Sequence, residues 1–383
     1  MREREQAVST TERYRTTGGA LLGALLFFVV SIAFLSGGEK PSFLTGKVTD
    51  LSGPDLSLEK KVASAGTEFR KAEAGKAYFT AYEFMSRHKI HREGTMRTAE
   101  GYAVNAKESK IRVEEKSRGK YQVGTDIEDT PSPAALLFLH DQTARGGILD
   151  VTVLDMDQTY EFSEAPVYWL GRAENAESVS FLEKSFDASK DSSRVQEKML
   201  FAAACHQGPQ GYLFLKKAAL GPSRDKVREM AVFWLGNYGD SKSLADLKEI
   251  YDKEESLSVK KQIIFAIQLS KRTEAVEELI WIAKQDGSSE ARKQAVFWLG
   301  QKASAESVKA LKDIVESADE TDPMKEQAIF AISQQPKDRS VPMLIDIAKT
   351  NKSASVRKRA LFWLGQSGDP AALKLFEEIL LKK

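Results

Sequence analysis

The sequence predicts an all-α right-handed solenoid in the C-terminal half, preceded by a small β-rich domain and one N-terminal transmembrane helix. Three features predict this: a long uncharged apolar stretch near the N-terminus, alternating apolar and polar residues further on, and an aromatic motif that recurs at a fixed interval. We expect a cytoplasmic N-terminus at 1–17, an anchor at 18–38, a tether at 39–57, the β-rich domain at 58–164 and the solenoid at 165–383.

The composition excludes several classes of function. The 383 residues include 56 Lys+Arg and 55 Asp+Glu, for a net charge of +1, so the chain lacks the basic excess of a nucleic-acid binder. One cysteine, Cys205, permits neither an internal disulfide nor a site built from several thiolates. Only four histidines are present, which weighs against most metal-dependent catalysis. We therefore expect no cofactor and no nucleic-acid partner.

The N-terminal apolar stretch predicts a membrane anchor. No charged residue occurs between Arg15 and Glu39, and residues 20–35 are apolar apart from Ser31 and small residues. A bilayer core of ~30 Å needs about 20 helical residues, which residues 18–38 supply. Arginines precede this stretch and few basic residues follow it, so the positive-inside rule keeps the N-terminus in the cytoplasm. The bulk of the chain would then lie outside the cytoplasm, in the periplasm of a Gram-negative cell.

A cleaved signal peptide is the alternative for the same stretch. Small residues occupy the −3 and −1 positions of two candidate cleavage sites, at 31–33 and 36–38. The long leading segment with its three glutamates favours an uncleaved anchor.

Between the anchor and the repeats, the pattern predicts a small β-rich domain. Residues 39–57 are rich in Gly, Pro and Ser, as in a tether. Beyond them, short runs are rich in aromatic residues or alternate apolar and polar residues, as strands do. Gly or Pro residues separate these runs. These runs are 78–84, 110–115, 121–127, 135–140 and 148–154. We expect five or six antiparallel strands.

The strongest pattern is an internal repeat. The tetrapeptide Tyr/Phe-Trp-Leu-Gly occurs four times, and a Phe stands midway between each pair of copies. The leading aromatics, 32 or 33 residues apart, are Tyr168, Phe201, Phe233, Phe265, Phe297, Phe330 and Phe362. A second apolar column follows each of them by 14 residues. Each unit is therefore expected to be two short antiparallel helices, and about seven such units must stack to bury their apolar faces.

Two units carry a more specific pattern, Val-Arg-x-x-Ala-x-x-x-Leu-Gly followed by Gly-Asp. It is matched from Val227 to Asp240 and from Val356 to Asp369. This pattern resembles the HEAT-like repeats, specifically the short class first described in phycobilin lyases. The resemblance implies a helix-pair solenoid over residues 165–383 and leaves the function open, because such repeats serve many roles. The whole layout also looks like that of membrane-anchored bacterial HEAT-repeat proteins.

Four of the five tryptophans belong to the repeat, and alanine replaces them in the alternate units. They are Trp169, Trp234, Trp298 and Trp363, alternating with Ala202, Ala266 and Ala331. The full period is therefore about 65 residues, a large unit alternating with a small one. We interpret the tryptophans as a packing ladder between repeats, because large aromatics at helical core positions are usually buried. The alternative is an aromatic stripe that binds a peptide or ligand.

Basic residues also recur at one repeat position and form a candidate partner-binding ridge. They are Arg228, Lys260, Lys261, Arg292, Lys293, Lys325, Arg357 and Lys358. Such a ridge would receive an acidic partner surface. Solvated helix faces paired with nearby acids are the alternative.

These patterns together predict a membrane-anchored, non-catalytic scaffold for protein–protein interaction, or an envelope sensor, which acts through the solenoid surface. The alternative is a lyase-like or enzyme-accessory protein that binds a small ligand in the solenoid groove. We find no phosphate-binding loop and no nucleophile elbow. Cys205 and its neighbour His206 would point about 100° apart on a helix, so we expect a buried, inert thiol.

Overall fold

The structure is a computed structural model that describes residues 41–53, 56–72, 75–90, 96–97, 103–107, 130–142, 147–302 and 304–381. The predicted cytoplasmic segment and anchor, and the strands expected at 110–115 and 121–127, lie outside the described residues. Within the described ranges, no helix combines the length and the apolar character needed to cross a membrane.

The N-terminal part is a mixed sheet with one helix on it. Its elements are β1 (Leu44–Asp50), α2 (Leu58–Lys71), β2 (Ala77–Ser86), β3 (Met96–Arg97), β4 (Ala103–Lys107), β5 (Ser132–Asp141), β6 (Ile148–Asp155) and β7 (Thr159–Arg172). The strand order is β3-β4-β7-β2-β5-β6, and β1 pairs with β7. The β-rich character is as predicted. The purely antiparallel arrangement is wrong, because β1 and β2 both run parallel to β7.

Two segments of the β-rich part differ from the prediction. Part of the expected tether, Leu44–Asp50, is strand β1, whose Thr45 also donates a hydrogen bond to the carbonyl of Tyr160. Gly46 adopts a φ of +88°, and a Cβ added there would meet the carbonyl oxygen of Phe162, so a glycine is required at this point of the strand pair. The region predicted as β-rich also contains the helix α2, which was not predicted from the sequence.

The first copy of the aromatic tetrapeptide is a strand and not a helix. Residues 168–171 lie at the end of β7, and the solenoid begins at Asn175 instead of at residue 165. Trp169 is buried in the sheet, where its ring meets Phe43 edge-on at a centroid distance of 5.6 Å. It does not belong to the repeat ladder.

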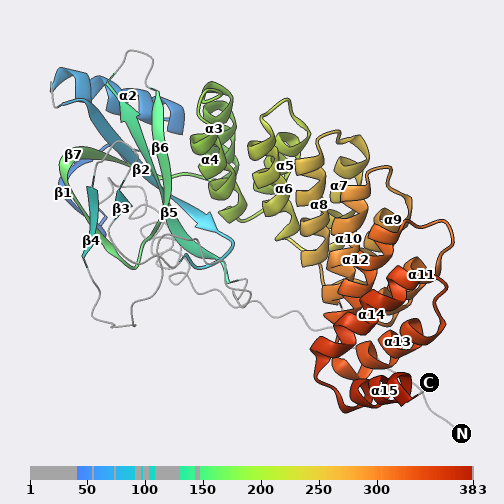
Figure 1. Ribbon diagram of the computed structural model, residues 1–383. Helices are drawn as coiled ribbons and strands as arrows, with labels where there is room; N and C mark the ends of the chain where they lie inside the picture. The colour runs from blue at the N-terminus through green and yellow to red at the C-terminus, as the bar shows by residue number, and fades with distance from the viewer. Residues whose placement is uncertain are drawn as a thin grey trace, which may run out of the picture.

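Thirteen described helices follow as a stack of antiparallel pairs. They are α3 (Asn175–Ala188), α4 (Ser193–Cys205), α5 (Pro209–Leu220), α6 (Asp225–Gly236), α7 (Ser241–Lys253), α8 (Leu257–Leu269), α9 (Thr273–Gln285), α10 (Ser289–Lys302), α11 (Ala305–Glu316), α12 (Asp322–Ser333), α13 (Lys337–Thr350), α14 (Ala354–Ser367) and α15 (Pro370–Leu381). Polar caps start several of them: Asp240 accepts a hydrogen bond from the amide of Ser243 at 2.7 Å, and Ser304 from that of Ser307 at 3.1 Å. The stack is curved, as Figure 1 shows. The even-numbered inner helices, α4 to α14, line its concave side, and the odd-numbered outer helices line its convex side.

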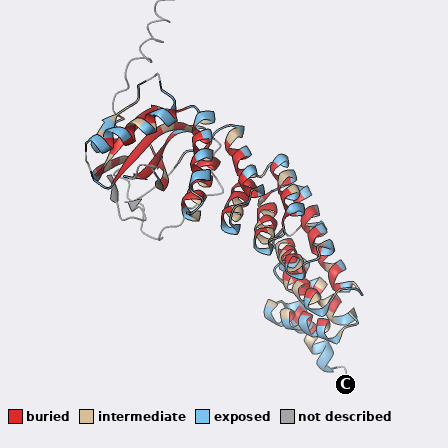
Figure 2. Cartoon of the chain, turned by 90° about the horizontal axis from the view of Figure 1, so that it is seen from above, coloured by how far each residue is buried: buried red, intermediate tan, exposed pale blue. Residues whose placement is uncertain are grey.

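One hydrophobic core runs from the sheet through the solenoid. Alternate residues of β2 and β5 face α3 and α4, and Figure 2 shows buried residues continuing from the sheet into the helices of the solenoid. At the junction, Phe138 of β5 meets Phe181 of α3 edge-on at 5.3 Å. Ser86 of β2 also pairs with His206 in an antiparallel bridge. The β-rich part therefore closes the N-terminal end of the solenoid.

The other end is less polar than the sequence suggested. The sequence of the last helix, with Lys374, Glu377 and Glu378, predicts a polar outer side for a helix that caps the stack. The helix buries Ala372 and Leu375, yet Leu373, Leu380 and Leu381 are 62%, 76% and 84% exposed. The outer side of this terminal helix is therefore apolar as well as charged.

Candidate functional site

The three tryptophans of the inner helices, Trp234, Trp298 and Trp363, fill every second interface between these helices. Trp234 packs on Phe201, Trp298 on Phe265 and Trp363 on Phe330, with ring centroids 5.0, 5.3 and 5.2 Å apart. Trp234 is 8% exposed, and the other two are partly buried. Each tryptophan thus lies between its own unit and the preceding alanine-type unit.

The alternate interfaces are closed by glycine against alanine. A Cβ added at Gly236 would lie 2.7 Å from the Cβ of Ala266, and one at Gly300 would lie 2.9 Å from the Cβ of Ala331. The inner helices therefore approach closely at α6–α8 and α10–α12, and are held apart by indole rings at α4–α6, α8–α10 and α12–α14. This alternation is the physical reason for the period of about 65 residues.

Each of these tryptophans has an indole N–H group that lacks a hydrogen-bond partner. Among the described residues, the enclosed indole nitrogens of Trp234, Trp298 and Trp363 have no hydrogen-bond partner. A buried donor without a partner costs roughly 1–3 kcal/mol. The three sites are equivalent in the repeat, so the burial of the large rings must outweigh this cost in each.

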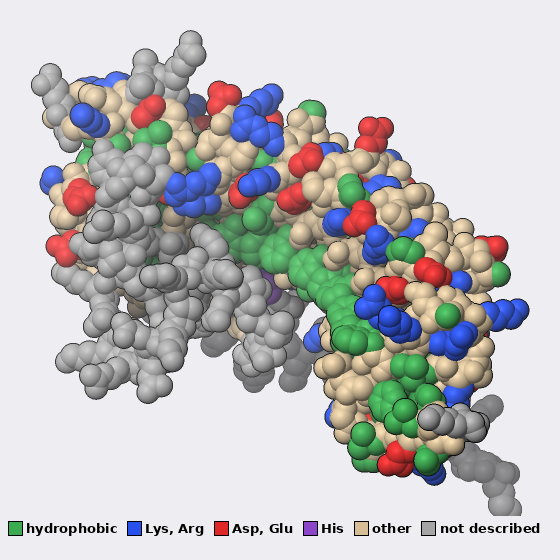
Figure 3. All heavy atoms as spheres, viewed as in Figure 1, with side chains coloured by type: hydrophobic (Ala, Val, Ile, Leu, Met, Phe, Trp, Pro, Cys, Tyr) green, Lys and Arg blue, Asp and Glu red, His purple; other side chains and the backbone are tan. Residues whose placement is uncertain are grey.

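The residue before each tryptophan forms a row along the concave face. This phenylalanine row consists of Phe201, Phe233, Phe265, Phe297, Phe330 and Phe362, one on each inner helix. The first five are partly buried, and Phe362 is 50% exposed. The rings of Phe233 and Phe265 lie parallel with centroids 6.2 Å apart. Figure 3 shows hydrophobic side chains gathered in a continuous band along the inner side of the stack.

Our sequence reasoning concentrated on the tryptophans and overlooked this row. The signal was present, because the position is Phe in every helical unit whereas the next position alternates between Trp and Ala. The alternation of tryptophan and glycine–alanine interfaces explains why Trp and Ala alternate at one position. It does not explain why the preceding position is always Phe.

The predicted basic ridge is largely paired within the chain. Arg228 contacts Glu254 at 2.8 Å, Lys260 contacts Asp286 at 3.4 Å, and Arg292 contacts Glu320. In each case a basic residue of an inner helix meets an acid at or just beyond the end of the next outer helix. A shallow polar hollow beside the first pair is lined by Asp225, Arg228, Lys253, Glu254, Glu255 and Ser256.

The other ridge residues have varied surroundings. Lys261 and Lys293 both contact Glu290, at 3.6 and 3.0 Å. Arg357 donates to the carbonyls of Asn351 and Lys352, at 2.8 and 2.9 Å. Lys325 is partly buried and Lys358 is exposed. The arrangement thus resembles the alternative of paired helix faces, and recruitment of an acidic partner stays a prediction.

The outer helices carry a ladder of ion pairs. One lysine–carboxylate contact of 2.6–3.1 Å links each successive pair from α3 to α15. The contacts are Lys217–Glu183, Lys216–Asp246, Lys248–Glu278, Lys284–Asp313, Lys312–Asp346 and Lys349–Glu378. This ladder neutralises much of the convex face.

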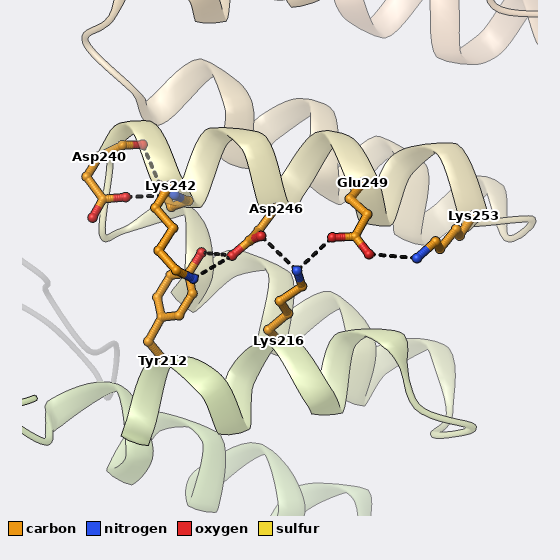
Figure 4. Close-up of polar contacts among 8 residues, drawn as sticks. Tyr212, Lys216, Asp240, Lys242, Asp246, Glu249 and Lys253 are labelled. Carbon is orange, nitrogen blue, oxygen red and sulfur yellow. Dashed lines mark hydrogen bonds and ion pairs between the residues drawn. The ribbon is translucent and has the colours of Figure 1, made fainter. Parts of the chain in front are cut away.

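The most elaborate rung joins α5 to α7 (Figure 4). Asp246 accepts hydrogen bonds from Tyr212, from Lys216 at 2.7 Å and from Lys242 at 2.9 Å. Burial alone would raise the pKa of Asp246, but these hydrogen bonds outweigh it and lower the pKa to about 2. The cluster is consistent with a structural role, because its charges are already compensated.

A buried serine–histidine contact joins the two parts of the molecule. Ser178 Oγ lies 2.7 Å from His206 Nε2 and 2.9 Å from the hydroxyl of Tyr82, and His206 Nδ1 lies 2.8 Å from the carbonyl of Ala202. Ser178 and His206 are 0% and 1% exposed, so no substrate reaches them. Burial lowers the pKa of His206 to about 4 and raises that of the adjacent Cys205 thiol to about 12. The thiol is buried, as expected. In the described ranges, no group of three or more His, Cys, Asp or Glu side chains is placed to hold a metal ion.

The fold and this concave face define a helical-repeat solenoid protein. The PBS lyase HEAT-like repeat family model matches residues 227–253 and 356–382, so these two units are HEAT-like repeats of that kind. These are the two units in which the sequence pattern was complete. A comparison with curated proteins gave no match.

Several solved structures match part of the chain at low identity. They include human deoxyhypusine hydroxylase in complex with glycerol (18% identity, TM-score 0.25) and YibA of E. coli (17%, 0.33), which each cover 54% of this chain and match over 79% and 77% of their own. A mutant of Kap121p (14%, 0.31) also covers 54% of this chain, and 22% of its own is matched. Likenesses this distant bear on no question of activity.

Proposed function

We propose that the protein is a non-catalytic scaffold that binds a protein partner along the concave face of its solenoid. The observation that carries this proposal is the phenylalanine row, in which six large apolar side chains remain partly or half exposed side by side. Contiguous apolar surface on a folded protein marks interaction sites, because leaving it in water costs about 25 cal/mol for each Å².

The contrast between the two faces supports the same choice. On the convex face, lysines and carboxylates pair from helix to helix, so its charges are already matched. On the concave face, the band of rings has no comparable internal match (Figure 3). A curved stack closed at one end by a sheet is also a suitable rigid template for an extended surface.

A membrane location is the second part of the proposal. The uncharged apolar stretch at 18–38 supports an anchor that holds the sheet and the solenoid at the outer face of a membrane. Anchoring would raise the local concentration of the scaffold for partners at that surface. The β-rich part, packed on α3 and α4, would serve as the sensor portion if the protein relays a signal.

A lyase-like or accessory role receives less support from the geometry. The serine–histidine contact is closed to substrate, and the thiol beside it is buried. The half-exposed aromatics form a long row instead of converging on one point, which suits an extended partner better than a small ligand.

Photo-crosslinking in intact cells tests the scaffold proposal. A benzophenone amino acid replaces Phe265 in the row, and in a matched variant it replaces Trp281, which is 45% exposed on the outer helix α9. We expect a defined protein adduct from position 265 and none of the same mass from position 281. Identical adducts from both positions, or no protein adduct from position 265, would contradict the proposal.

A further inference from the structure

The position four residues before each phenylalanine of the row is always charged. Residues four apart share a helix face, so each of these side chains stands beside its phenylalanine on the concave side. From the sheet toward the end of the stack, they are Glu197, Glu229, Lys261, Lys293, Glu326 and Lys358. Each inner helix from α4 to α14 therefore presents one ring and one charge together.

Three of these six charges have partners within the chain. Lys261 and Lys293 both contact Glu290, at 3.6 and 3.0 Å. Glu326 of α12 contacts Arg359 of α14. These contacts lie in the middle of the row and toward its far end, so the charges there are largely matched.

The other three charges, Glu197, Glu229 and Lys358, form no ion pair in the part of the chain that the structure describes. Lys358 is exposed, so water solvates its ammonium group. The two glutamates are partly buried, and they lie on α4 and α6, the first two inner helices beside the sheet (Figure 1). A charge that is partly removed from water gains more from a partner than an exposed one does.

The two carboxylates also act on each other. Burial raises the pKa of Glu197; the charge of Lys226 opposes this shift, and the charge of Glu229 adds to it. Lys226 is exposed, and within the described ranges it forms no ion pair with either glutamate. A cation placed between the two carboxylates would remove their repulsion and offset their loss of hydration.

Aromatic rings complete the surroundings of the two glutamates. Phe201 and Phe233 stand one turn after Glu197 and Glu229, and both rings meet the indole of Trp234 at centroid distances of 5.0 Å. A guanidinium group suits this combination, because it stacks on aromatic faces and donates hydrogen bonds to carboxylates. A metal ion does not, since no third His, Cys, Asp or Glu of the described ranges joins the pair.

We infer that the concave face binds a polypeptide segment that carries an arginine next to apolar residues. The arginine would lie between Glu197 and Glu229, and the apolar residues would cover the phenylalanines that follow toward the end of the stack. The inference rests on the proposed function and gives the partner a chemistry. Charge complementarity selects this occupant over a nucleic acid or an anionic lipid surface, because their phosphates would meet two unpaired carboxylates.

Selection from random peptides tests this chemistry without presupposing a sequence. The full chain, held in lipid nanodiscs, selects from phage that display random dodecapeptides, and we expect enrichment of arginine beside leucine or aromatic residues. A double variant, Glu197→Gln with Glu229→Gln, should not enrich arginine. The matched control is Asp252→Asn with Glu277→Gln, which removes two exposed charges from the outer helices α7 and α9. This control should enrich arginine as the wild type does.

Fluorescence anisotropy with one selected peptide, labelled with fluorescein, then measures the affinity. We expect the glutamine double variant to bind it at least about tenfold more weakly, because charge-assisted hydrogen bonds are lost. Citrulline in place of the arginine is neutral and similar in shape. This replacement should weaken binding to the wild type by a similar factor, and binding to the double variant by no more than about twofold.

Thermal unfolding separates a binding role of the two glutamates from a structural one. The midpoint of the glutamine double variant should not fall, because the substitutions remove two like charges that lack partners. A lower midpoint would show that the carboxylates serve the fold and would overturn the inference. Enrichment of acidic or uncharged peptides, equal weakening by the convex-face control, or an equal citrulline effect on both proteins would overturn it as well.

The crosslinking experiment distinguishes failure of the inference from failure of the proposed function. If no arginine-bearing peptide is selected while position 265 still crosslinks to a protein, the scaffold stands and only the arginine site falls. If position 265 also gives no protein adduct, the scaffold proposal falls with it.

Discussion

Trp298 of α10 packs its indole on the ring of Phe265 of α8, with centroids 5.3 Å apart and planes inclined by 54°. The contact has equivalents at Trp234–Phe201 and Trp363–Phe330, so one geometry holds three of the inner interfaces. It also connects the two aromatic positions of the repeat: the tryptophan fills the interface, and the phenylalanine stands at the concave surface. The packing ladder and the phenylalanine row are therefore in direct contact along this face.

Truncating Trp298 should destabilise the solenoid. We expect Trp298→Ala to lower the free energy of unfolding by about 2–4 kcal/mol, because the ring separates two helices that would be left with a cavity. Trp298→Phe should cost less, since it also removes the indole N–H that has no partner among the described residues. Chemical denaturation followed by circular dichroism measures both. Trp281→Ala on the outer face is the control. A comparable loss of unfolding free energy in that variant would contradict a particular role of Trp298 in the α8–α10 interface.

Glycine in the repeat motif should have opposite effects in two copies. Gly300→Ala would place a Cβ 2.9 Å from both the Cβ and the carbonyl oxygen of Ala331. Overpacking of this kind costs typically 1–3 kcal/mol, which outweighs the roughly 1 kcal/mol that alanine gains in a helix. At Gly365 the nearest atom would be the Cζ of Phe376, at an ordinary 3.8 Å.

Gly365→Ala should therefore stabilise the protein by up to about 1 kcal/mol, whereas Gly300→Ala destabilises it. Thermal unfolding of the two variants, side by side, measures the difference in sign. Destabilisation of both by the same amount would show that the Gly–Ala contact does not define the alternate interfaces.

The sequence predicted the helical stack because two apolar columns recur through it, and such columns are positions in a core. It failed at Tyr168–Gly171, where the Tyr-Trp-Leu-Gly copy of the tetrapeptide forms a strand. The residue types do not decide between helix and strand, because Tyr, Trp and Leu occur in both. The surroundings decide: β7 pairs with β1, β2 and β4, and Gly171 takes a φ of +79° that ends the strand before α3. These partners are distant in sequence.

The candidate site was harder to predict for a related reason. Phe297 and Trp298 are adjacent and both apolar, and helical periodicity places both near the buried arc. Which of them reaches solvent depends on the curvature of the stack and on the closeness of the α10–α12 contact at Gly300. The pairing of Arg228 with Glu254 likewise depends on where the end of α7 lies, which the repeat period does not reveal.

The buried histidine should make stability depend on pH. Burial lowers the pKa of His206 to about 4, below its ordinary value of 6.5. The unfolded chain therefore takes up a proton between these values that the folded chain does not. Stability should fall as the pH drops from about 6.5 to about 4, by about 3 kcal/mol in all.

The measurement is the free energy of unfolding at several pH values, for the wild type and for His206→Gln. The variant should lose the slope in that window, because an amide does not titrate. Other groups contribute equally to both proteins, so the difference between the two curves isolates His206. Parallel curves would mean that the pKa of His206 is the same in the folded and the unfolded chain, which would contradict the prediction.

Two charges of the predicted basic ridge should behave differently. Arg228 contacts Glu254, whose side chain is 4% exposed, whereas Lys358 is exposed to solvent. Arg228→Gln should cost about 1–3 kcal/mol of stability, because it leaves a buried carboxylate without its cation. Lys358→Gln should change stability by less than about 0.5 kcal/mol. Denaturation curves of the two variants give this comparison.

Lys358→Gln also tests the predicted basic ridge. If this substitution weakens the crosslinking of a partner at position 265, the partner contacts basic residues as well as the phenylalanine row. If it leaves capture unchanged, the basic residues serve the fold and take no part in recognition.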